Sequence, residues 1–456
     1  MSLREVKVGR QKFQVKENLL DKVIATLSPE RGARRLQAKL TMALVGGYKG
    51  ASKRRRQTQS WVTSGGDADT DILLDLPALR ERSRDLVRNA PIATGAINTA
   101  TTNVVGSGLK LYPQIDADFL GMTPEQKEKW EADTLRRFNL WAKSKNCDIE
   151  RTLNFFQMQE LVFRSAFENG DTFCNLPRKA VQGLPGDQPL RLQLIEADRV
   201  CNESFQRDGD KLAGGVERDD DGAPIRYHIL KQHPGNMLKT KSAEWVKIDA
   251  FGQASGLRNI LHLYRPLRPG QSRGVPDLAP AIEPLRQLEQ YTDAELTAAV
   301  VSGMFTVFVK SASGAGMGTM GPTSETGGSS TDEDYKLSAG AIVEMAEGDS
   351  IETANPGRPN ANFDPFWVSM VRQIGMSLEI PFEILVKHFS SSYSASRAAM
   401  LEAWRFFKNR RQWLGDDFCQ EVYTIWLYIE VAEGRIAAPG FLRDALTRQA
   451  GLGSLW

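Results

Sequence analysis

Cysteine and histidine are scarce in this chain of 456 residues. Its four cysteines lie far apart and form no CxxC pair: Cys147, Cys174, Cys201 and Cys419. This spacing argues against a zinc site and against a disulfide framework. The four histidines cannot form the HExxH pair that binds zinc in metalloproteases. We therefore expect free thiols in a reducing cytoplasm, and no metal or other cofactor.

Long apolar runs are also missing. The longest uncharged apolar stretch, residues 296–309, is shorter than the roughly 18 residues that a membrane span needs. The N-terminus carries Arg4, Glu5 and Lys7 and no apolar core, so it does not resemble a secretory signal. These absences predict a protein without a membrane partner.

Catalytic motifs are absent as well. No G-x-x-x-x-G-K-[ST] sequence is present, so no phosphate-binding loop of that kind is expected. The stretch DADTD at 67–71 resembles the start of a calcium loop, but Ile72 stands where that loop needs glycine. The serines of 390–396 have Lys387 and His388 nearby, but no G-x-S-x-G motif surrounds them. The sequence therefore favours a structural or binding protein over an enzyme.

Charge is unevenly distributed along the chain. Residues 1–56 hold 15 Lys and Arg against 4 Asp and Glu, a net charge of +11. The remainder holds 43 basic and 52 acidic residues, a net charge of −9. Such a basic arm suits an anionic partner, either nucleic acid or an acidic protein surface. A solvated tail explains the same composition equally well.

Periodicity and turn signals divide the body of the chain into helices and strands. Residues 76–168 read as four helices, with a break just before Pro91. Beyond them the pattern changes to that of strands, and residues 214–230 read as a hairpin that turns at Gly222 in an Asp-Gly pair. His262 lies inside another strand and is interpreted as a hydrogen-bonded core residue. This section is expected to be an α+β domain.

The C-terminal part is expected to contain long helices. Apolar residues recur at helical spacing from Leu278 to Val300 and form one stripe. A second long helix is interrupted at Pro381, and a last helix over about 396–435 has its natural kink site at Gly415.

The stretch FSSSYSASRAAMLEAWRFFKNRR, residues 389–411, joins a neutral segment to a basic helix. Five of its first eight residues are serine, and none of the eight is charged. The remainder has a helical pattern rich in arginine, lysine and aromatic residues. A neutral, hydroxyl-bearing segment directly before a basic helix calls for a functional explanation.

Several long motifs, in this order along the chain, resemble those of the portal proteins of tailed bacteriophages, specifically the lambda-type family. The likeness is carried by NLLDKVIATLSPERGARRLQAK, YKGASKRRR, RSRDLVRNAPIATGAINTATTNVVGSGLKL, GDSIETANPGRPNANFDPFWVSMVRQIGMSLEIPFEIL and SYSASRAAMLEAWRFFKNRRQWL. It spans nearly the whole chain. Chains of this family usually continue past the point where this sequence stops, at Trp456, so either the crown is short or a C-terminal tail is absent here.

The resemblance implies an α+β portal fold with an α/β wing, a two-helix stem, a small β-containing clip and a long kinked helix that leads to a helical crown. The implied division of this chain is a basic N-terminal arm and linker at 1–75, a wing at 76–275, a first stem helix at 276–304, a clip at 305–362, a second stem helix at 363–387, a tunnel loop at 388–396, a long kinked helix at 397–436 and a crown or C-terminal segment at 437–456.

The resemblance also implies a ring oligomer, typically a dodecamer, at one capsid vertex of the virion, assembled in the cytoplasm of the bacterial host. Double-stranded DNA would be packaged and ejected through this ring without sequence preference. Its partners would be the terminase large subunit, then the head-tail adaptor protein, and the major capsid or scaffold protein. Two alternatives remain: a DNA-processing enzyme of the packaging machinery, such as a nuclease or maturation protease, and a capsid or tail-assembly protein without a channel.

In such a ring the neutral segment would face the DNA. The expected contacts are His388, Phe389, Ser390, Ser391, Ser392, Tyr393, Ser394 and Arg397. Serine hydroxyls can donate to phosphates while remaining uncharged, whereas each phosphate neutralised by a cation adds a salt-dependent contact with a slope of about −0.9. The later basic residues either line the channel or pair with carboxylates of neighbouring subunits, and we favour pairing for most of them: Arg405, Lys408, Arg410 and Arg411.

Overall fold

The computed structural model of the chain forms two compact units, residues 1–66 and 67–456, which are described separately. The described residues are 2–8, 11–17, 24, 26, 28–31, 33–34, 56–63, 65–180, 187–236, 243–303, 307–310, 350–353, 362–389 and 392–456. In the first unit β1 (Ser2–Val8) pairs with β2 (Gln11–Glu17) as an antiparallel hairpin, which the sequence analysis did not predict. Within the described residues, no helix combines the length and apolarity of a membrane span.

The second unit begins with five helices: α3 (Ala68–Ile72), α4 (Leu76–Asn89), α5 (Pro91–Val104), α6 (Pro124–Lys143) and α7 (Phe155–Asn169). Local sequence explains where they begin. Proline stands in the first turn of α4, α5 and α6, where its missing N–H costs nothing. Thr123 with Gln126, and Asn154 with Gln157, form capping boxes that satisfy free N–H groups of α6 and α7.

Two antiparallel sheets follow these helices. In the first, β4 (Asp171–Asn175) lies between β10 (Ile260–Tyr264) and β5 (Gln193–Ile195). The second has the order β6 (Leu212–Ala213), β7 (Val216–Arg218), β8 (Pro224–Leu230) and β9 (Trp245–Asp249). The hairpin predicted at Gly222 is present between β7 and β8, and Gly222 has the positive φ of 86° that this turn requires.

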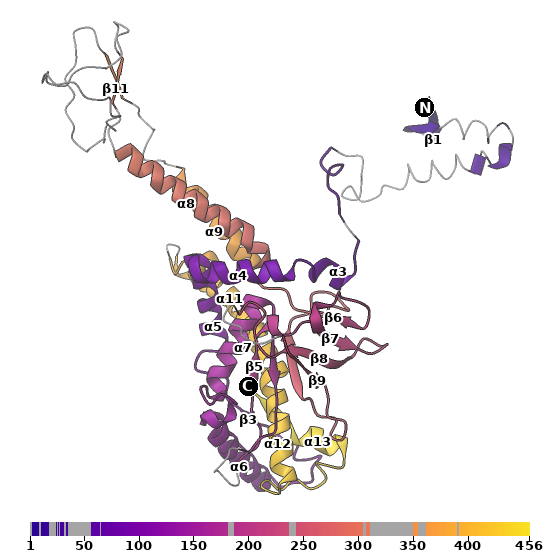
Figure 1. The fold of residues 1–456 in the computed structure, drawn as a ribbon, viewed down its shortest axis with the longest axis vertical. Coiled ribbons are helices and arrows are strands. Elements are labelled where there is room, and N and C mark those ends of the chain that lie inside the picture. Colours follow the sequence, from indigo (N-terminus) through magenta and orange to yellow (C-terminus); the bar gives the residue numbers. More distant parts are fainter. Residues whose placement is uncertain are drawn as a thin grey trace, which may run out of the picture. The chain divides into compact units, whose positions relative to one another are not determined.

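The C-terminal part contains the long helices of Figure 1. A short 3₁₀ helix, η5 (Ala279–Ala281), leads into α8 (Ile282–Gly303), and β11 (Val307–Lys310) pairs with β12 (Ser350–Thr353) before α9 (Phe363–Ser377). Helices α8 and α9 lie side by side, because the ring of Tyr291 contacts Phe363 and Phe366 at centroid distances of 5.5 and 4.8 Å. The remaining elements are α10 (Phe382–Leu385), α11 (Tyr393–Leu414), η6 (Gly415–Gln420), α12 (Glu421–Ala432), α13 (Ala445–Gly451), and β13 (Ser454–Leu455), which pairs with β3 (Tyr112–Pro113).

One hydrophobic core joins α5, α6, α7, α11 and α12. Its centre is aromatic: the ring of Phe138 meets those of Trp426 and Tyr423 edge-on at 5.2 and 5.7 Å. Trp456 packs against Phe138 and Phe155, so the end of the described chain is held in this core. Full burial of one such side chain stabilises the fold by about 1.5–3 kcal/mol.

The last helices begin and break somewhat differently from the prediction. Helix α11 begins at Tyr393, so Ser394 and Ser396 lie in its first turn and not in a loop. The interruption expected at Gly415 is present as the π-helical turn η6, which continues directly into α12. Most of the range predicted as the clip lies outside the described residues, apart from β11 and β12.

Candidate functional site

The serine segment, residues 388–397, comprises the last residues between α10 and α11 together with the first turn of α11. His388 and Phe389 are exposed, and the His388 N–H donates to Glu383 O at 3.0 Å. Ser392 is the N-cap of α11, and its hydroxyl accepts from the backbone of Ala395 at 3.4 Å. The structure thus fixes one edge of the segment at a helix start, while Ser390 and Ser391 lie outside the described residues.

The described side chains of the serine segment project into solvent. Tyr393 is 80% exposed and Phe389 51% exposed, and Ser392, Ser394 and Arg397 are exposed as well. None of these five packs into the core, so all are available to a large ligand. The arrangement offers hydroxyls and rings with two exposed cations at its edges, Lys387 and Arg397, which suits contact with a polyanion better than a buried catalytic site.

The basic residues of α11 have partners mostly within the same chain. Arg410 is buried and its Nη2 donates to Asp277 Oδ1 at 2.5 Å. Arg411 donates to the carbonyls of Asn103 and Val104, both at 2.9 Å, at the end of α5. The expectation that such residues pair with neighbouring subunits is therefore wrong for these two, because long-range contacts of the chain itself occupy them.

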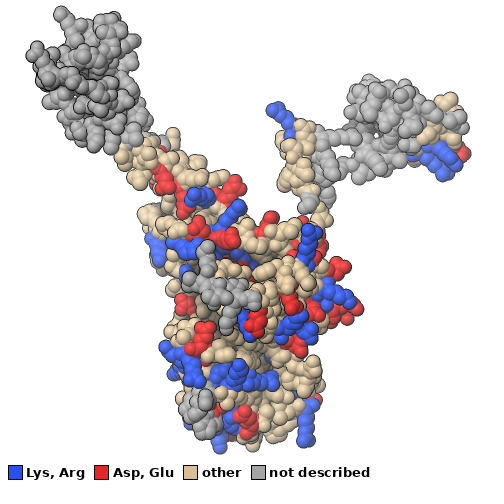
Figure 2. Space-filling view, in the orientation of Figure 1, with Lys and Arg blue, Asp and Glu red and all other residues tan. Residues whose placement is uncertain are grey.

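The other basic residues of α11 remain on its surface. Arg405 pairs with Glu402 one turn earlier at 3.1 Å, and both side chains are strongly exposed, so the pair contributes little to stability. Arg397 and Lys408 are exposed, and within the described part of the chain the side chain of neither makes a hydrogen bond or ion pair. Figure 2 shows basic and acidic side chains interspersed over the visible face of the second unit, with no large area of one sign.

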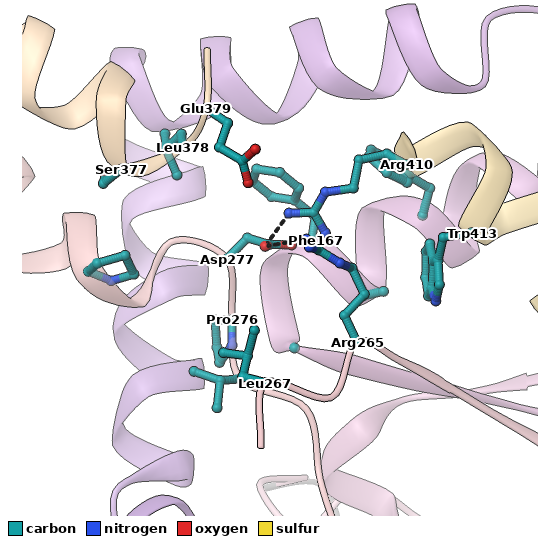
Figure 3. Close-up of a pocket in the computed structure, with 15 residues that line it drawn as sticks. Phe167, Arg265, Leu267, Pro276, Asp277, Ser377, Leu378, Glu379, Arg410 and Trp413 are labelled. Atoms are coloured by element: carbon teal, nitrogen blue, oxygen red, sulfur yellow. Dashed lines mark hydrogen bonds and ion pairs between the residues drawn. The ribbon is translucent and has the colours of Figure 1, made fainter. Parts of the chain in front are cut away.

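A small cavity of about 220 Å³ is lined by residues of α7, of the segments 265–267 and 275–280, of the end of α9 and of α11 (Figure 3). The segment 275–280 enters from β10, Ser377 to Glu379 end α9, and Arg410 and Trp413 come from α11. Asp277 is the electrostatic centre, since it also lies 3.8 Å from Arg265. Sequence analysis missed this junction, because no local pattern links residues more than 130 positions apart.

The residues around this cavity hold α11 against the rest of the second unit. Arg410 also lies over the ring of Phe406, with its guanidinium carbon 5.1 Å from the centroid. At the end of α9, Glu379 has a left-handed backbone with φ of 57°, a conformation that costs a residue other than glycine about 1–2 kcal/mol. The chain accepts this strain where it turns from α9 towards α10, and the turn sets the direction from which the serine segment begins.

A buried charge cluster holds the two sheets against α4. Asp171, fully buried on β4, accepts from Arg80 at 2.7 Å, Arg273 at 2.6 Å and His262 at 3.1 Å. Burial alone would raise the pKa of the Asp171 carboxyl, but Arg273 and Arg80 hold it well below its usual value. Burial lowers the pKa of His262 to about 4, against the opposing effect of Asp171. His262 is thus the hydrogen-bonded core residue that the sequence predicted.

One group of side chains has the composition of a metal site. Glu196, Asp198 and His233 bring ligand atoms within 4.8 Å of one another. However, Asp198 already pairs with Arg80 at 3.3 Å and more closely with Arg84. Two guanidinium groups on the same carboxylate oppose a bound cation, so the residues do not fit a metal.

The acidic stretch at 67–71 has a structural role. Asp67 caps α3 by accepting from Thr70 N at 3.1 Å, and Asp69 accepts from Ser272 N at 2.7 Å. Asp71 pairs with Arg268 at 2.6 Å. These carboxylates attach α3 to the segment that leads into α8, in agreement with the rejection of a calcium loop.

Comparison with known families identifies the chain. The family model for phage portal proteins matches residues 54–411, well over half of the sequence. The chain is therefore a phage portal protein, a structural and not an enzymatic class. Within that class it belongs to the lambda family, which confirms the resemblance and gives no support to a packaging nuclease or protease.

Individual relatives are distant. Portal protein B of Escherichia phage lambda is 24% identical over 425 residues, which cover 88% of this chain and 77% of the relative. The portal protein of Escherichia phage N15 is 24% identical over 416 residues, covering 85% and 75%. A chain in the virion of a native gene transfer agent particle aligns with a TM-score of 0.44 and 15% identity, covering 84% of this chain and 94% of that one.

Proposed function

We propose that copies of this portal protein form a closed, dodecameric ring at one capsid vertex, and that the serine segment lies on the inner wall where double-stranded DNA passes. The DNA would enter during packaging, driven by the terminase large subunit, and leave through the same ring. The ring would then seat the head-tail adaptor, within a shell of capsid or scaffold protein assembled in the host cytoplasm.

The order of the helices and sheets supports a division of the chain into domains with different roles. Residues 76–275, with both sheets, would form the wing. Helices α8 and α9 would form the stem, with the clip at 305–362 between them docking terminase and then the adaptor. The tunnel loop, predicted at 388–396, would be shorter and comprise residues 388–392, because 393–396 belong to α11. The long helix at 397–436 would lead to a crown at 437–456.

The proposal of a sliding contact with DNA is supported by the partners that most of the cations of α11 already have. Arg410 and Arg411 are bound to Asp277 and to the end of α5, and Arg405 shares its charge with Glu402. Of the basic residues of α11, Arg397 alone then lies within one turn of the exposed serines. A ring repeats each contact in every subunit. Even a binding free energy of about 1 kcal/mol per copy, the size of one ordinary hydrogen bond, would therefore add up to a total that stops the DNA from moving.

A test adds charge to the serine segment without disturbing its helix start. In the double variant Ser390→Lys/Ser391→Lys, the cap at Ser392 is kept. We expect rings of normal size, stalled packaging in a reconstituted reaction, and DNA retention whose salt dependence steepens by about 0.9 per new phosphate contact. The neutral variant Ser390→Thr/Ser391→Thr and the distant charge variant Leu140→Lys, on exposed α6, are the matched controls. Normal packaging by the lysine variant would refute the sliding contact.

A further inference from the structure

Helix α11 leaves one apolar flank uncovered. Tyr393, Met400, Leu401 and Trp404 recur at helical spacing and are 80, 55, 58 and 41% exposed. Because residues three or four apart share a helix face, they form one continuous row. The exposed cations Arg397 and Lys408 fall on the same row. We call these six residues the α11 row.

Helix α8 has a second uncovered row of opposite charge. Its apolar stripe is buried at Leu285 and Leu288, 1 and 3% exposed, and the stripe continues to Leu296 and Val300, which are 65 and 53% exposed. The acidic residues Glu289 and Asp293 lie on the same face, seven and three positions before Leu296. Asp293 is exposed, whereas Glu289 is half-buried and pairs with Arg286 at 3.2 Å. Glu289, Asp293, Leu296 and Val300 are the α8 row.

The two rows match in length, character and charge. The two ends of the α8 row lie eleven positions apart, and so do Arg397 and Lys408 in the α11 row, which is about 16 Å of helix in each case. Each combines large exposed apolar side chains with an exposed charge at one end, the basic Lys408 on α11 and the acidic Asp293 on α8. The side chain of Asp293, like that of Lys408, makes no hydrogen bond or ion pair within the described residues. Within one copy, α8 packs against α9 through Tyr291, on another side of the helix.

We propose that the α11 row of one copy packs against the α8 row of a second copy of this chain. With the two helices antiparallel, Lys408 meets Asp293, Trp404 lies opposite Leu296, and Met400 and Leu401 lie opposite Val300. Because the two rows are different surfaces, the contact is heterologous and repeats from copy to copy until a ring closes. The inference rests on the proposed ring and specifies which surfaces meet in it.

Cross-linking tests whether the rows meet. Cysteine pairs combine Leu296→Cys or Val300→Cys with Met400→Cys or Leu401→Cys, in a Cys201→Ser background because the other three native cysteines are buried. A short bismaleimide should link purified rings into a ladder of covalent multimers. The single-cysteine variants, and Leu296→Cys paired with Leu140→Cys on α6, should give no ladder. If none of the four pairs cross-links in assembled rings, the proposal is wrong.

A charge exchange tests the same contact without cross-linker. Asp293→Lys and Lys408→Asp should each lower the yield of rings severalfold, since each places like charges opposite one another. The double variant should restore most of that yield. Asn409→Asp, one residue further on and outside the α11 row, is the control and should assemble normally. Double variants no better than the single ones would overturn the pairing.

Failure of this inference is distinguishable from failure of the proposed function. Ring formation by the unmodified protein is scored separately by particle mass and negative-stain imaging. Rings that form without any cross-link refute only the pairing of the two rows. Absence of rings from the unmodified protein refutes the proposed function and the pairing with it.

Discussion

Stability should fall on mild acidification because of one buried histidine. His262 stacks between Phe173 and Tyr264, with both centroid distances at 4.2 Å, and its Nε2 lies 3.1 Å from Asp171. In the folded chain the pKa of His262 is lowered from 6.5 to about 4, chiefly by burial. The folded state therefore keeps the imidazole neutral, while the unfolded chain binds a proton below about pH 6.5.

The sign and the size of this pH effect on the free energy of unfolding follow from proton linkage. Because the unfolded state binds more protons between about pH 6.5 and 4, the free energy of unfolding is highest above this window and decreases as pH falls through it. Each unit of pKa difference corresponds to about 1.4 kcal/mol, so the full effect is about 3 kcal/mol, of which about 2 kcal/mol should be lost by pH 5. The pKa of Asp171 lies well below its usual value, so its own contribution is lost only at lower pH.

Urea unfolding at fixed protein concentration, repeated from about pH 7.5 to pH 5, measures this effect. The variant His262→Gln keeps a donor for Asp171 but cannot titrate, so its profile should be flatter than that of the unmodified protein. His388→Gln removes an exposed histidine instead and should leave the profile unchanged. If the profiles of His262→Gln and the unmodified protein run parallel, His262 does not carry the pH dependence.

Three further contacts that position the long helices and the sheets are tested by substitution. Asp277→Asn and Arg410→Gln should each cost about 1–3 kcal/mol, and the double variant clearly less than their sum, in a double-mutant cycle of urea unfolding. Gly274→Ala should destabilise the fold by about 3 kcal/mol or more, because the added Cβ would lie 2.0 Å from Gly170 O. In the control Gly209→Ala the added Cβ meets nothing within 4 Å, so this variant should be nearly neutral in thermal unfolding. Asn154→Ala removes the cap of α7 and should cost about 1 kcal/mol in the same assay. A neutral Asn154→Ala would mean that the capping box does not stabilise α7.

Local sequence predicted the elements that have local causes. The break before Pro91, the helix at 124–143 and the turn at Gly222 are all present, because proline, capping residues and an Asp-Gly pair act over a few positions. The start of α11 was placed too late because a serine-rich stretch is typical of a loop. Serine is also a preferred N-cap, and the alanines that follow Ser392 favour helix.

Long-range charge pairing could not be predicted from the same signals. The sequence assigned the cations of α11 to neighbouring subunits, yet Arg410 finds its partner 133 positions away. Nothing in the spacing of Arg80, Asp171 and Arg273 indicates that they form one buried cluster. Such contacts depend on which elements become neighbours in the fold, and periodicity along one element carries no information about that.

The apolar stripe of α8 shows that periodicity predicts which face of a helix is apolar, but not what packs against that face. The spacing continues unchanged from Leu285 through Leu296, but the first side chain is 1% exposed and the second 65%. Exposing a leucine that could be buried forgoes about 1.5–3 kcal/mol, a large amount against a net stability of only about 5–15 kcal/mol. A chain that extends an apolar row beyond what its own helices bury is therefore suited to assembly. In the ring that we propose, the surface that could cover this row in every copy is that of the next copy.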